Sequence, residues 1–551
     1  MVCKQHTGFR LFLYYKKNTV IIISGLILFF SIVKALNNHF GQKVNSFEGR
    51  FLVFLPFAAY VILSIISSLF SPYKDYACKG MMEQFESIWV IAGYFLICVY
   101  SYTIYYREMF IVFGFSTALI GAIGTLQFWG IDIYRMKLFQ KFFMPQSMQE
   151  IPFHFNAESG RTYCTFSNPN YVGMFCCLVI PVLTVLTFHA KSRLEKILYG
   201  VSNVMMICSL VGSHSKSGIL VCVVCMLLLL VVCRKQIASK VRYLSKGSIV
   251  SMVFVIVVIS SMIVRHRGSF IESFYDIINR KNEPETNINE IGTYNNTVKI
   301  VYDSRELFFD IDYDKSSLKD TIKIVDEFGN PYSVSERQGV LYFEEEELLQ
   351  LTTSLVQYGD YVAIQIGDGN LYWYFTDQTP DHTWYYLTSY GKPDKLISNE
   401  VDVYRGLNGL EHIVSGRGYI WSRTIPLLKK NILIGSGQNC FMMVFPNNDY
   451  LGMAKWGYKG KIITKPHCMY MQIAVESGML SLVVLIAFWC CFFVKVISNK
   501  SKYTLLKAIA IGILGYLLTG ITNDSNVGVA PIFWMLIGIG FRLCYDKEEL
   551  L

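Results

Sequence analysis

Most of the chain consists of long apolar runs separated by short polar segments. Uncharged stretches such as 248–264 and 478–494 are just long enough to cross the hydrocarbon of a bilayer, because a helix rises about 1.5 Å per residue. The pattern predicts a polytopic α-helical membrane protein with about 11–12 transmembrane helices. The eleven candidate spans lie near 19–36, 51–70, 86–105, 109–129, 171–188, 196–213, 217–233, 248–265, 470–496, 504–521 and 529–544.

The pattern changes between about 268 and 410, where apolar and polar residues alternate as they do in β-strands. Strand-like runs at 297–302, 321–325, 361–366 and 371–375 are separated by turn-forming sequences. This predicts an antiparallel β-sandwich inserted between two membrane regions. The predicted domains are an N-terminal transmembrane bundle at 1–265, a β-rich insert at 266–414, a catalytic loop with short helices at 415–469 and C-terminal transmembrane helices at 470–551.

The insert carries a cluster of aromatic residues, namely Trp373, Tyr374, Trp384, Tyr385 and Tyr386. Such rings either stack on sugar rings or fill the core of a sheet. Their alternation along the chain favours the core.

Composition narrows the function classes. Hydrophobic residues make up 53% of the 551 residues and the mean hydropathy is +0.36, which excludes a soluble enzyme. The net charge of +9 does not indicate a nucleic-acid partner, because the basic residues concentrate in loops that would meet anionic lipid headgroups. Most of the 15 cysteines lie inside apolar runs, so we expect neither a disulfide framework nor a metal site.

Basic loops predict the orientation, since lysine and arginine accumulate in short cytoplasmic loops. The loops at 189–196, 234–246 and 495–507 are assigned to the cytoplasm, which places the β insert outside the cytoplasmic membrane. The basic N-terminus conflicts with this, because eight spans would return the chain to the side on which it began. Either one span is missed or the N-terminus is outside. The first apolar run is expected to be a retained helix rather than a cleaved signal.

Three ionisable residues stand at the edges of apolar segments: Lys216, Arg417 and His467. An ionisable group at a membrane boundary is costly unless it binds a partner, so each is a candidate functional residue. All three fall on the predicted outer side. Two cations and one imidazole suit an anionic lipid substrate.

Several motifs surround these residues at the borders of the apolar runs. They are Gly416-Arg417 with Trp421, Gly435-x-Gly437, Pro466-His467-x-x-Tyr470-x-Gln472 with Glu476-x-Gly478, Arg161-Thr162-x-x-Thr165-Phe166-x-Asn168-Pro169-Asn170, and Asn523-Asp524-Ser525 with Phe533-Trp534. As a set they resemble the O-antigen ligase and polymerase family of membrane glycosyltransferases. The resemblance covers nearly all of the membrane part and not the β insert.

The resemblance implies an activity and a donor. Members of this family transfer a glycan from an undecaprenyl pyrophosphate lipid to an acceptor hydroxyl outside the cytoplasmic membrane, without a metal ion or cofactor. On this basis Arg417 and Lys216 would bind the pyrophosphate and stabilise its developing charge, with Arg161 sharing the task. His467 would accept the proton of the acceptor, and the displacement would invert the anomeric carbon.

The resemblance also implies substrate-binding roles for Asn168, Asn170, Tyr470 and Gln472. Asn168 and Asn170 could equally cap the helix that follows them. Lys216 stands where many family members carry arginine, so it would hold a phosphate as a point charge rather than through a bidentate fork.

Other functions stay open at this point. A ligase and a polymerase share the donor chemistry and differ in the acceptor, which is a different glycan or protein for the first and a repeat-carrying lipid for the second. A flippase that moves the lipid-linked oligosaccharide would carry charges along the bundle interior and show repeat symmetry, and the sequence shows neither. A third possibility is a non-catalytic assembly protein whose β domain binds a partner.

Overall fold

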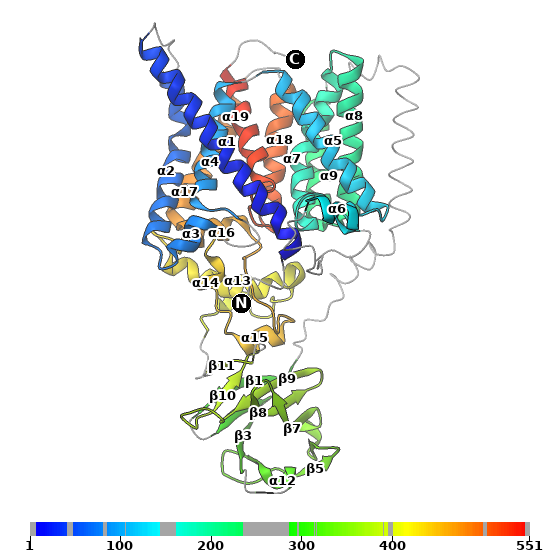
Figure 1. Ribbon diagram of the computed structural model, residues 1–551, viewed down its shortest axis with the longest axis vertical. Helices are drawn as coiled ribbons and strands as arrows, with labels where there is room; N and C mark the ends of the chain where they lie inside the picture. Colours follow the sequence, from blue (N-terminus) through cyan, green and yellow to red (C-terminus); the bar gives the residue numbers. More distant parts are fainter. Residues whose placement is uncertain are drawn as a thin grey trace. The chain divides into compact units, whose positions relative to one another are not determined.

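The computed structural model describes residues 7–40, 48–80, 85–104, 106–143, 161–234, 286–294, 297–312, 315, 317–388, 391–394, 401–499 and 504–545. The chain divides into two compact units (Figure 1). The first unit comprises Met1–Ile278, Leu427–Val444 and Thr464–Leu551 and is helical. The second unit comprises Asn279–Pro426 and Phe445–Ile463 and contains all the described strands. The loop region predicted at 415–469 is therefore shared between the two units.

Long apolar helices build the first unit. They are α1 Thr7–Phe40, α2 Leu55–Phe70, α4 Ile88–Thr103, α5 Glu108–Phe128, α7 Pro169–His189, α8 Arg193–Ser213, α9 Lys216–Val232, α17 Met479–Ser498, α18 Thr504–Thr519 and α19 Ala530–Tyr545. Six of the described helices are long and apolar enough to cross a membrane: α1, α2, α5, α7, α8 and α17. The expected helical character is confirmed at ten of the eleven predicted spans, and the span at 248–265 lies outside the described residues.

Helix α7 forms the centre of the first unit. Of its apolar stretch, 83% is buried inside the protein, against 17% for α1. Gly173 of α7 meets Gly218 of α9 so closely that a Cβ on either residue would clash with Ser215 or with the facing backbone. Helices α8, α9 and α18 pack against α7, and several helices of the unit turn part of their apolar surface outward.

Helix α1 begins at the same end of the first unit as α7. Lys16 Nζ donates hydrogen bonds to the carbonyl and hydroxyl oxygens of Thr165 at 2.9 Å, and Lys17 Nζ donates to the carbonyl of Lys79 at 3.0 Å. Thr165 lies just before α7, and Lys79 ends the short helix α3, Lys74–Lys79. The basic N-terminal end therefore lies at the end of the unit where α7 starts.

The single span predicted at 470–496 is divided in the structure. Helix α16, Met469–Ser477, ends at Gly478, and α17 begins at the next residue. Gly478 has φ +100°, a conformation that side chains of L-residues rarely adopt, and a Cβ there would lie 2.8 Å from the carbonyl oxygen of Leu433. The glycine allows the chain to turn while the 431–437 segment packs against it.

The β domain of the second unit consists of two antiparallel sheets, as predicted (Figure 1). The first has the order β1-β2-β3-β4 and the second β11-β10-β9-β8-β7-β6-β5. The strands are β1 Ile288–Thr293, β2 Val298–Tyr302, β3 Arg305–Ile311, β4 Ile322–Val325, β5 Val334–Arg337, β6 Val340–Phe343, β7 Leu351–Tyr358, β8 Tyr361–Asp368, β9 Leu371–Thr376, β10 Tyr385–Leu387 and β11 Pro393–Asp394. Residues of both sheets contribute to one hydrophobic core.

The core interpretation of the aromatic cluster is confirmed for its largest members. Trp373, Trp384 and Tyr386 are buried in the core of the β domain. Tyr374 lies on the opposite face of β9, where its ring stacks on Tyr358 with centroids 4.1 Å apart. Alternation along β9 thus separates core rings from surface rings.

Short helices complete both units. They are α6 Lys137–Phe143, α12 Leu318–Thr321, α13 Ile413–Lys430, α14 Phe441–Val444 and α15 Tyr450–Lys455. Helix α13 runs from the second unit into the first, and α15 packs on the β domain core through Leu451 and Ala454.

Candidate functional site

The imidazole of His467 faces a buried carboxylate in the first unit. His467 Nδ1 lies 3.3 Å from Asp524 Oδ2, and the side chains are 29% and 1% exposed. His467 belongs to the loop before α16, and Asp524 to the loop between α18 and α19. An imidazole that donates from Nδ1 to a carboxylate keeps the lone pair of Nε2 for accepting a proton. The pair is thus within ion-pair distance, and the ion pair forms when the imidazole is protonated.

His467 also has an unusual backbone conformation. Its φ is 54°, in the left-handed region that few residues other than glycine adopt. Such a conformation costs about 1–3 kcal/mol and persists only where surrounding contacts enforce it. Here the contacts come from both sides of the residue. Met469 N donates to the carbonyls of Gly520 and Asn523 at 2.8 Å each, while Lys465 Nζ donates to the Tyr171 hydroxyl at 3.2 Å.

A second buried carboxylate supports the loop that carries Asp524. Glu86, just before α4, accepts hydrogen bonds from the Tyr94 and Ser525 hydroxyls on Oε1, both at 2.8 Å. Gln472 Nε2 donates to Glu86 Oε2 at 3.3 Å, and Gln472 Oε1 accepts the backbone N–H of Ser525 at 2.8 Å. The residue next to Asp524 is therefore held through both its amide and its hydroxyl.

The glycine motif at 435–437 fits between α2 and the end of α16. A Cβ on Gly435 would lie 2.2 Å from the carbonyl oxygen of Glu476, so only glycine allows this approach. Ser436 N and Gly437 N donate to the carbonyls of Val475 and Glu476 at 2.8 and 3.0 Å. Ser67 and Ser68 of α2 accept hydrogen bonds from the amides of Gly437 and Gln438. The hydroxyl of Ser71, which follows α2, donates to the Ser436 carbonyl.

A small cavity lies between two carboxylates in this region. It has a volume of about 20 Å³, enough for one water molecule, and both Glu86 and Glu476 line it. Glu476 is 1% exposed, and its Oε1 has no hydrogen-bond partner among the described residues. Burial, followed by the nearby charges of Glu476 and Cys78, raises the pKa of the neighbouring Cys440 thiol to about 12. The Cys440 thiol therefore stays protonated at neutral pH.

Arg161 binds the turn between α8 and α9, and Lys216 follows that turn in the sequence. Arg161 Nε donates to the carbonyl of Ser213 at 3.2 Å, and the Thr162 amide donates to the carbonyl of Gly212 at 2.9 Å. Lys216 is the first residue of α9 and is half-buried. Two of the three cations predicted to bind phosphate therefore belong to the same part of the first unit.

Asn168 caps helix α7, which was one of its two predicted roles. Its side-chain oxygen accepts the amide of Asn170 at 2.9 Å. Both side chains are half-buried, so a contact with substrate stays a prediction. The Lys465–Tyr171 hydrogen bond links the start of α7 to the loop that carries His467. The Asn168 motif and the histidine motif thus come together.

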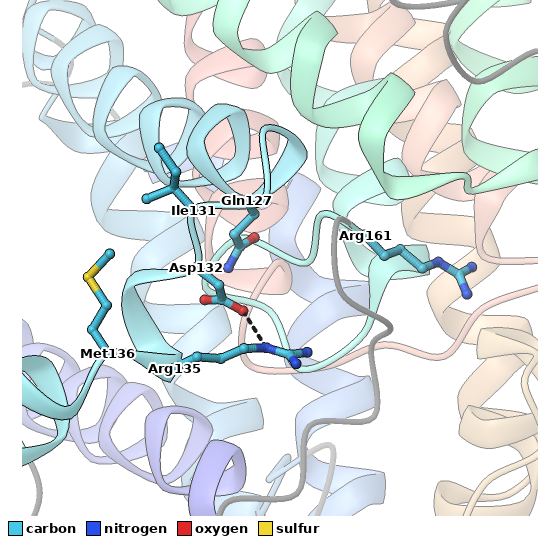
Figure 2. A pocket seen from close by; sticks show the side chains of 7 residues that line it. Gln127, Ile131, Asp132, Arg135, Met136 and Arg161 are labelled. Carbon is cyan, nitrogen blue, oxygen red and sulfur yellow. Dashed lines mark hydrogen bonds and ion pairs between the residues drawn. The ribbon is translucent and has the colours of Figure 1, made fainter.

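Arg161 borders a hollow of about 320 Å³ (Figure 2). Gln127, Asp132 and Arg135 also line it, and Asp132 pairs with Arg135 at 3.0 Å. Figure 2 shows that Arg161 points away from this pair. The hollow is large enough for a small polar ligand.

No family model, curated protein or solved structure matches this chain. Family membership therefore remains a resemblance that is carried by the motifs alone. Among the described residues, no group of three or more histidine, cysteine, aspartate or glutamate side chains is arranged to hold a metal ion.

Arg417 belongs to the second unit and follows a left-handed turn. Val414, Ser415 and Gly416 have φ values of 52°, 62° and 86°, so the regular part of α13 starts at Arg417. The Tyr458 hydroxyl donates to the Gly416 carbonyl at 3.0 Å, and the Tyr419 amide donates to the Glu411 carbonyl at 2.9 Å. The turn sets the position of Arg417 within its unit, and its approach to His467 stays a prediction.

A buried ion pair anchors α13 in the second unit. Arg423 Nε and the Tyr419 hydroxyl both donate to Asp449 Oδ2 at 2.9 Å. The guanidinium also lies 4.2 Å from the centre of the Tyr419 ring. Burial and the Asp449 charge raise the pKa of Tyr419 well above its usual range, so its hydroxyl stays a donor.

The two remaining predicted ligands make internal contacts. The Tyr470 hydroxyl donates to the carbonyl of Leu517 at 2.8 Å, and Gln472 is bonded to Glu86 and Ser525 as described. Their contact with substrate stays a prediction. Asp524 and Glu86 were not among the predicted site residues. Both carboxylates border apolar runs, and an ionisable residue in such a place is a functional candidate.

Proposed function

We propose that this protein is a polytopic membrane glycosyltransferase of the O-antigen ligase and polymerase type, acting in cell-surface polysaccharide biosynthesis. It moves a glycan from an undecaprenyl pyrophosphate lipid to an acceptor hydroxyl at the outer face of the cytoplasmic membrane. The observation that carries the proposal is the His467–Asp524 pair, 3.3 Å apart, at one end of an apolar helical unit. The motif resemblance supplies the substrate class.

Exposed apolar side chains support insertion into a bilayer. Phe29 and Phe30 of α1 are 59% and 60% exposed, and Leu220 and Val231 of α9 are 67% and 65% exposed. Soluble proteins rarely expose apolar surface on this scale over several helices. In a membrane the same side chains face lipid, so their exposure carries no free-energy penalty.

The proposed chemistry is a single displacement. The acceptor oxygen attacks the anomeric carbon while its proton passes to Nε2 of His467. The bond from that carbon to the phosphate oxygen breaks, and its electron pair leaves with the pyrophosphate. Asp524 stabilises the imidazolium that forms, as an orienting carboxylate does in a catalytic triad.

Cations stabilise the leaving pyrophosphate in this proposal. Arg161 and Lys216 come from one turn of the first unit, at the end where α7 begins. The motif resemblance implies Arg417 as the third cation of the clamp. Fixed cations aimed at developing charge provide a large share of catalysis in many enzymes, because they need no reorganisation during the reaction. The hollow beside Arg161 would accommodate a sugar of the donor or acceptor glycan.

The proposed orientation places the candidate site outside. The basic loops around 191–196 and 495–499 lie at the opposite ends of α8 and α17 from the site. The positive-inside rule assigns those loops to the cytoplasm. Helix α1 begins at the end of the unit that carries the candidate site, so its first residues are then outside as well. This agrees with the second explanation given for the conflict between the basic N-terminus and the number of spans.

Cells that carry His467→Asn test the proposal. Asparagine tolerates a left-handed backbone, so the variant removes the base without adding strain. We expect loss of the mature surface glycan and accumulation of lipid-linked repeats in the outer leaflet. His382→Asn is the matched control, because His382 also has a positive φ of 49° and lies in the β domain. Normal glycan in His467→Asn cells would favour the non-catalytic assembly role.

The length of the surface glycan distinguishes the two enzymes. Loss of a polymerase leaves single repeats on the final acceptor, whereas loss of a ligase leaves long polymer that is not attached. Electrophoresis of the glycan from His467→Asn cells provides this readout directly.

One observation favours a flippase as a second candidate. Glu86 and Glu476 are 2% and 1% exposed within an apolar helical unit, as expected of carboxylates on a transport or proton pathway. A flippase predicts that lipid-linked repeats accumulate in the inner leaflet of the variant. The same leaflet assay therefore separates transport from transfer.

A further inference from the structure

We propose that Glu86 is a positioning residue for the candidate site, and that together with Gln472 it holds the 523–526 loop so that Asp524 faces His467. This inference rests on the proposed glycosyl transfer. It assigns Gln472 to the support of the catalytic pair and gives Glu86, which none of the sequence motifs contains, a specific task.

Ser525 makes one hydrogen bond to Gln472 and one to Glu86. Its amide donates to Gln472 Oε1 at 2.8 Å, and its hydroxyl donates to Glu86 Oε1 at 2.8 Å. Gln472 Nε2 closes the ring by donating to Glu86 Oε2 at 3.3 Å. The amide and the hydroxyl of Ser525 are thus held by Gln472 and Glu86, and these two side chains are also hydrogen-bonded to each other.

The three residues come from distant parts of the chain. Glu86 precedes α4, Gln472 lies on α16, and Ser525 lies in the loop between α18 and α19. Helix α16 starts two residues after His467, and Ser525 directly follows Asp524. The Glu86–Gln472–Ser525 ring therefore connects the segment of the base to the segment of its carboxylate.

A carboxylate is required at position 86 because every facing group donates. The Tyr94 hydroxyl, the Ser525 hydroxyl and Gln472 Nε2 all point hydrogen atoms at it. A glutamine at 86 would turn its own NH₂ toward Gln472 Nε2, which would place two donors against each other. Glu86 is 2% exposed, so water cannot relieve that conflict.

The same geometry predicts a rescue. In Glu86→Gln/Gln472→Glu the amide and the carboxylate exchange places. The amide oxygen at 86 can accept from Tyr94 and Ser525, its NH₂ can donate to the carboxylate at 472, and that carboxylate can accept the Ser525 amide. All four hydrogen bonds form again, and only the one between residues 86 and 472 has its donor and acceptor exchanged.

Purified full-length variants in proteoliposomes test the inference with two readouts. The first is transfer from an undecaprenyl pyrophosphate-linked repeat, separated into kcat and KM for the donor. The second is the rate at which diethyl pyrocarbonate modifies His467, followed by mass spectrometry of its peptide. Glu195→Gln is the matched control, because Glu195 is another hydrogen-bonded carboxylate, paired with Arg107 at 2.6 Å at the opposite end of the unit.

For Glu86→Gln we expect kcat to fall at least ten-fold with KM within two-fold, and His467 modification to accelerate several-fold. The double variant should recover most of both values, and Glu195→Gln should change neither. The inference is overturned if Glu86→Gln changes neither kcat nor the rate of His467 modification. It is also overturned if Glu86→Gln lowers thermal stability while its effects on kcat and on His467 modification are no larger than those of Glu195→Gln. If the wild type transfers no glycan, the proposed function fails, while His467 modification still reports on the positioning.

Discussion

Asp524 Oδ2 lies 3.3 Å from His467 Nδ1, although the two residues belong to loops at the ends of different helices. The imidazole is partly exposed and the carboxylate is buried. In the proposed transfer, Nδ1 faces the carboxylate and Nε2 accepts the proton of the acceptor. This arrangement specifies which changes should impair transfer and which should not.

Asp524→Asn should lower kcat by about 100-fold or more with little change in thermal stability. Asparagine preserves the shape of the side chain but can donate toward Nδ1, which favours the tautomer that carries its proton on Nε2. In that tautomer Nε2 already carries a proton and cannot accept the proton of the acceptor hydroxyl. Turnover of lipid-linked donor by purified protein measures the effect.

A buried aspartate elsewhere provides the comparison for Asp524. Asp368 of the β domain is also buried, and it accepts the Thr286 hydroxyl at 2.6 Å. Asp368→Asn should leave kcat unchanged. If the two variants lose activity equally, the loss reflects folding and Asp524 has no special role.

Gly435→Ala should destabilise the first unit by about 1–3 kcal/mol. The new Cβ would lie 2.2 Å from the Glu476 carbonyl oxygen, which is backbone and cannot rotate away. Gly200→Ala in α8 is the control, because its Cβ would meet only Thr187 at 3.7 Å and should stabilise the helix by about 0.5–1 kcal/mol. Thermal unfolding in detergent should therefore shift in opposite directions.

Ser415→Gly should stabilise the turn before Arg417 by about 1 kcal/mol, because Ser415 has a φ of 62°. Gly329→Ala should cost a similar amount, since Gly329 has a φ of +85° and nothing lies within 4 Å of its Cβ position. Hydrogen exchange of the peptides around each residue reports both effects. Faster exchange in Ser415→Gly would contradict the assignment of strain to this turn.

Lys459 should make the stability of the β domain depend on pH. Burial lowers its pKa from the ordinary value of 10.5 to about 8. Between these two values the unfolded chain binds more protons than the folded one, so the contribution of Lys459 to stability rises as the pH increases from about 8 to 10.5. Below about pH 8 both states are protonated and the penalty is constant.

Lys459→Met isolates this effect. Lys459 Nζ lies 4.6 Å from the centre of the Trp373 ring. Methionine removes the titrating group and keeps an unbranched side chain at this position. We expect the variant to be more stable than the wild type at pH 7, with a difference that shrinks by pH 10. Urea unfolding followed by pulse proteolysis of the β domain measures it. A difference that is constant with pH would show that the lysine titrates normally.

Apolar periodicity was sufficient to predict the helical unit and the β insert. It could not predict the division at Gly478, because hydropathy does not report backbone conformation. The Gly435-x-Gly437 spacing indicated a tight loop. It could not indicate the partner of that loop, since the serines of α2 that bind it lie far away in the sequence.

The candidate site was predicted in part. The histidine motif and the Asn523-Asp524-Ser525 motif were both recognised, but their contact depends on how α16 and α18 pack. Glu86 lies outside these motifs, because its role arises from three facing donors on α4, on α16 and in the loop before α19. Long-range hydrogen bonds of this kind leave no local pattern in a sequence.

The central claim is that His467 is the base of an outer-leaflet glycosyl transfer. The most direct test is the rate at which purified protein in proteoliposomes releases undecaprenyl pyrophosphate from a lipid-linked repeat in the presence of acceptor. We predict that His467→Asn lowers kcat by about 10²–10⁴-fold, while His382→Asn matches the wild type. Equal turnover by the two variants would contradict the claim.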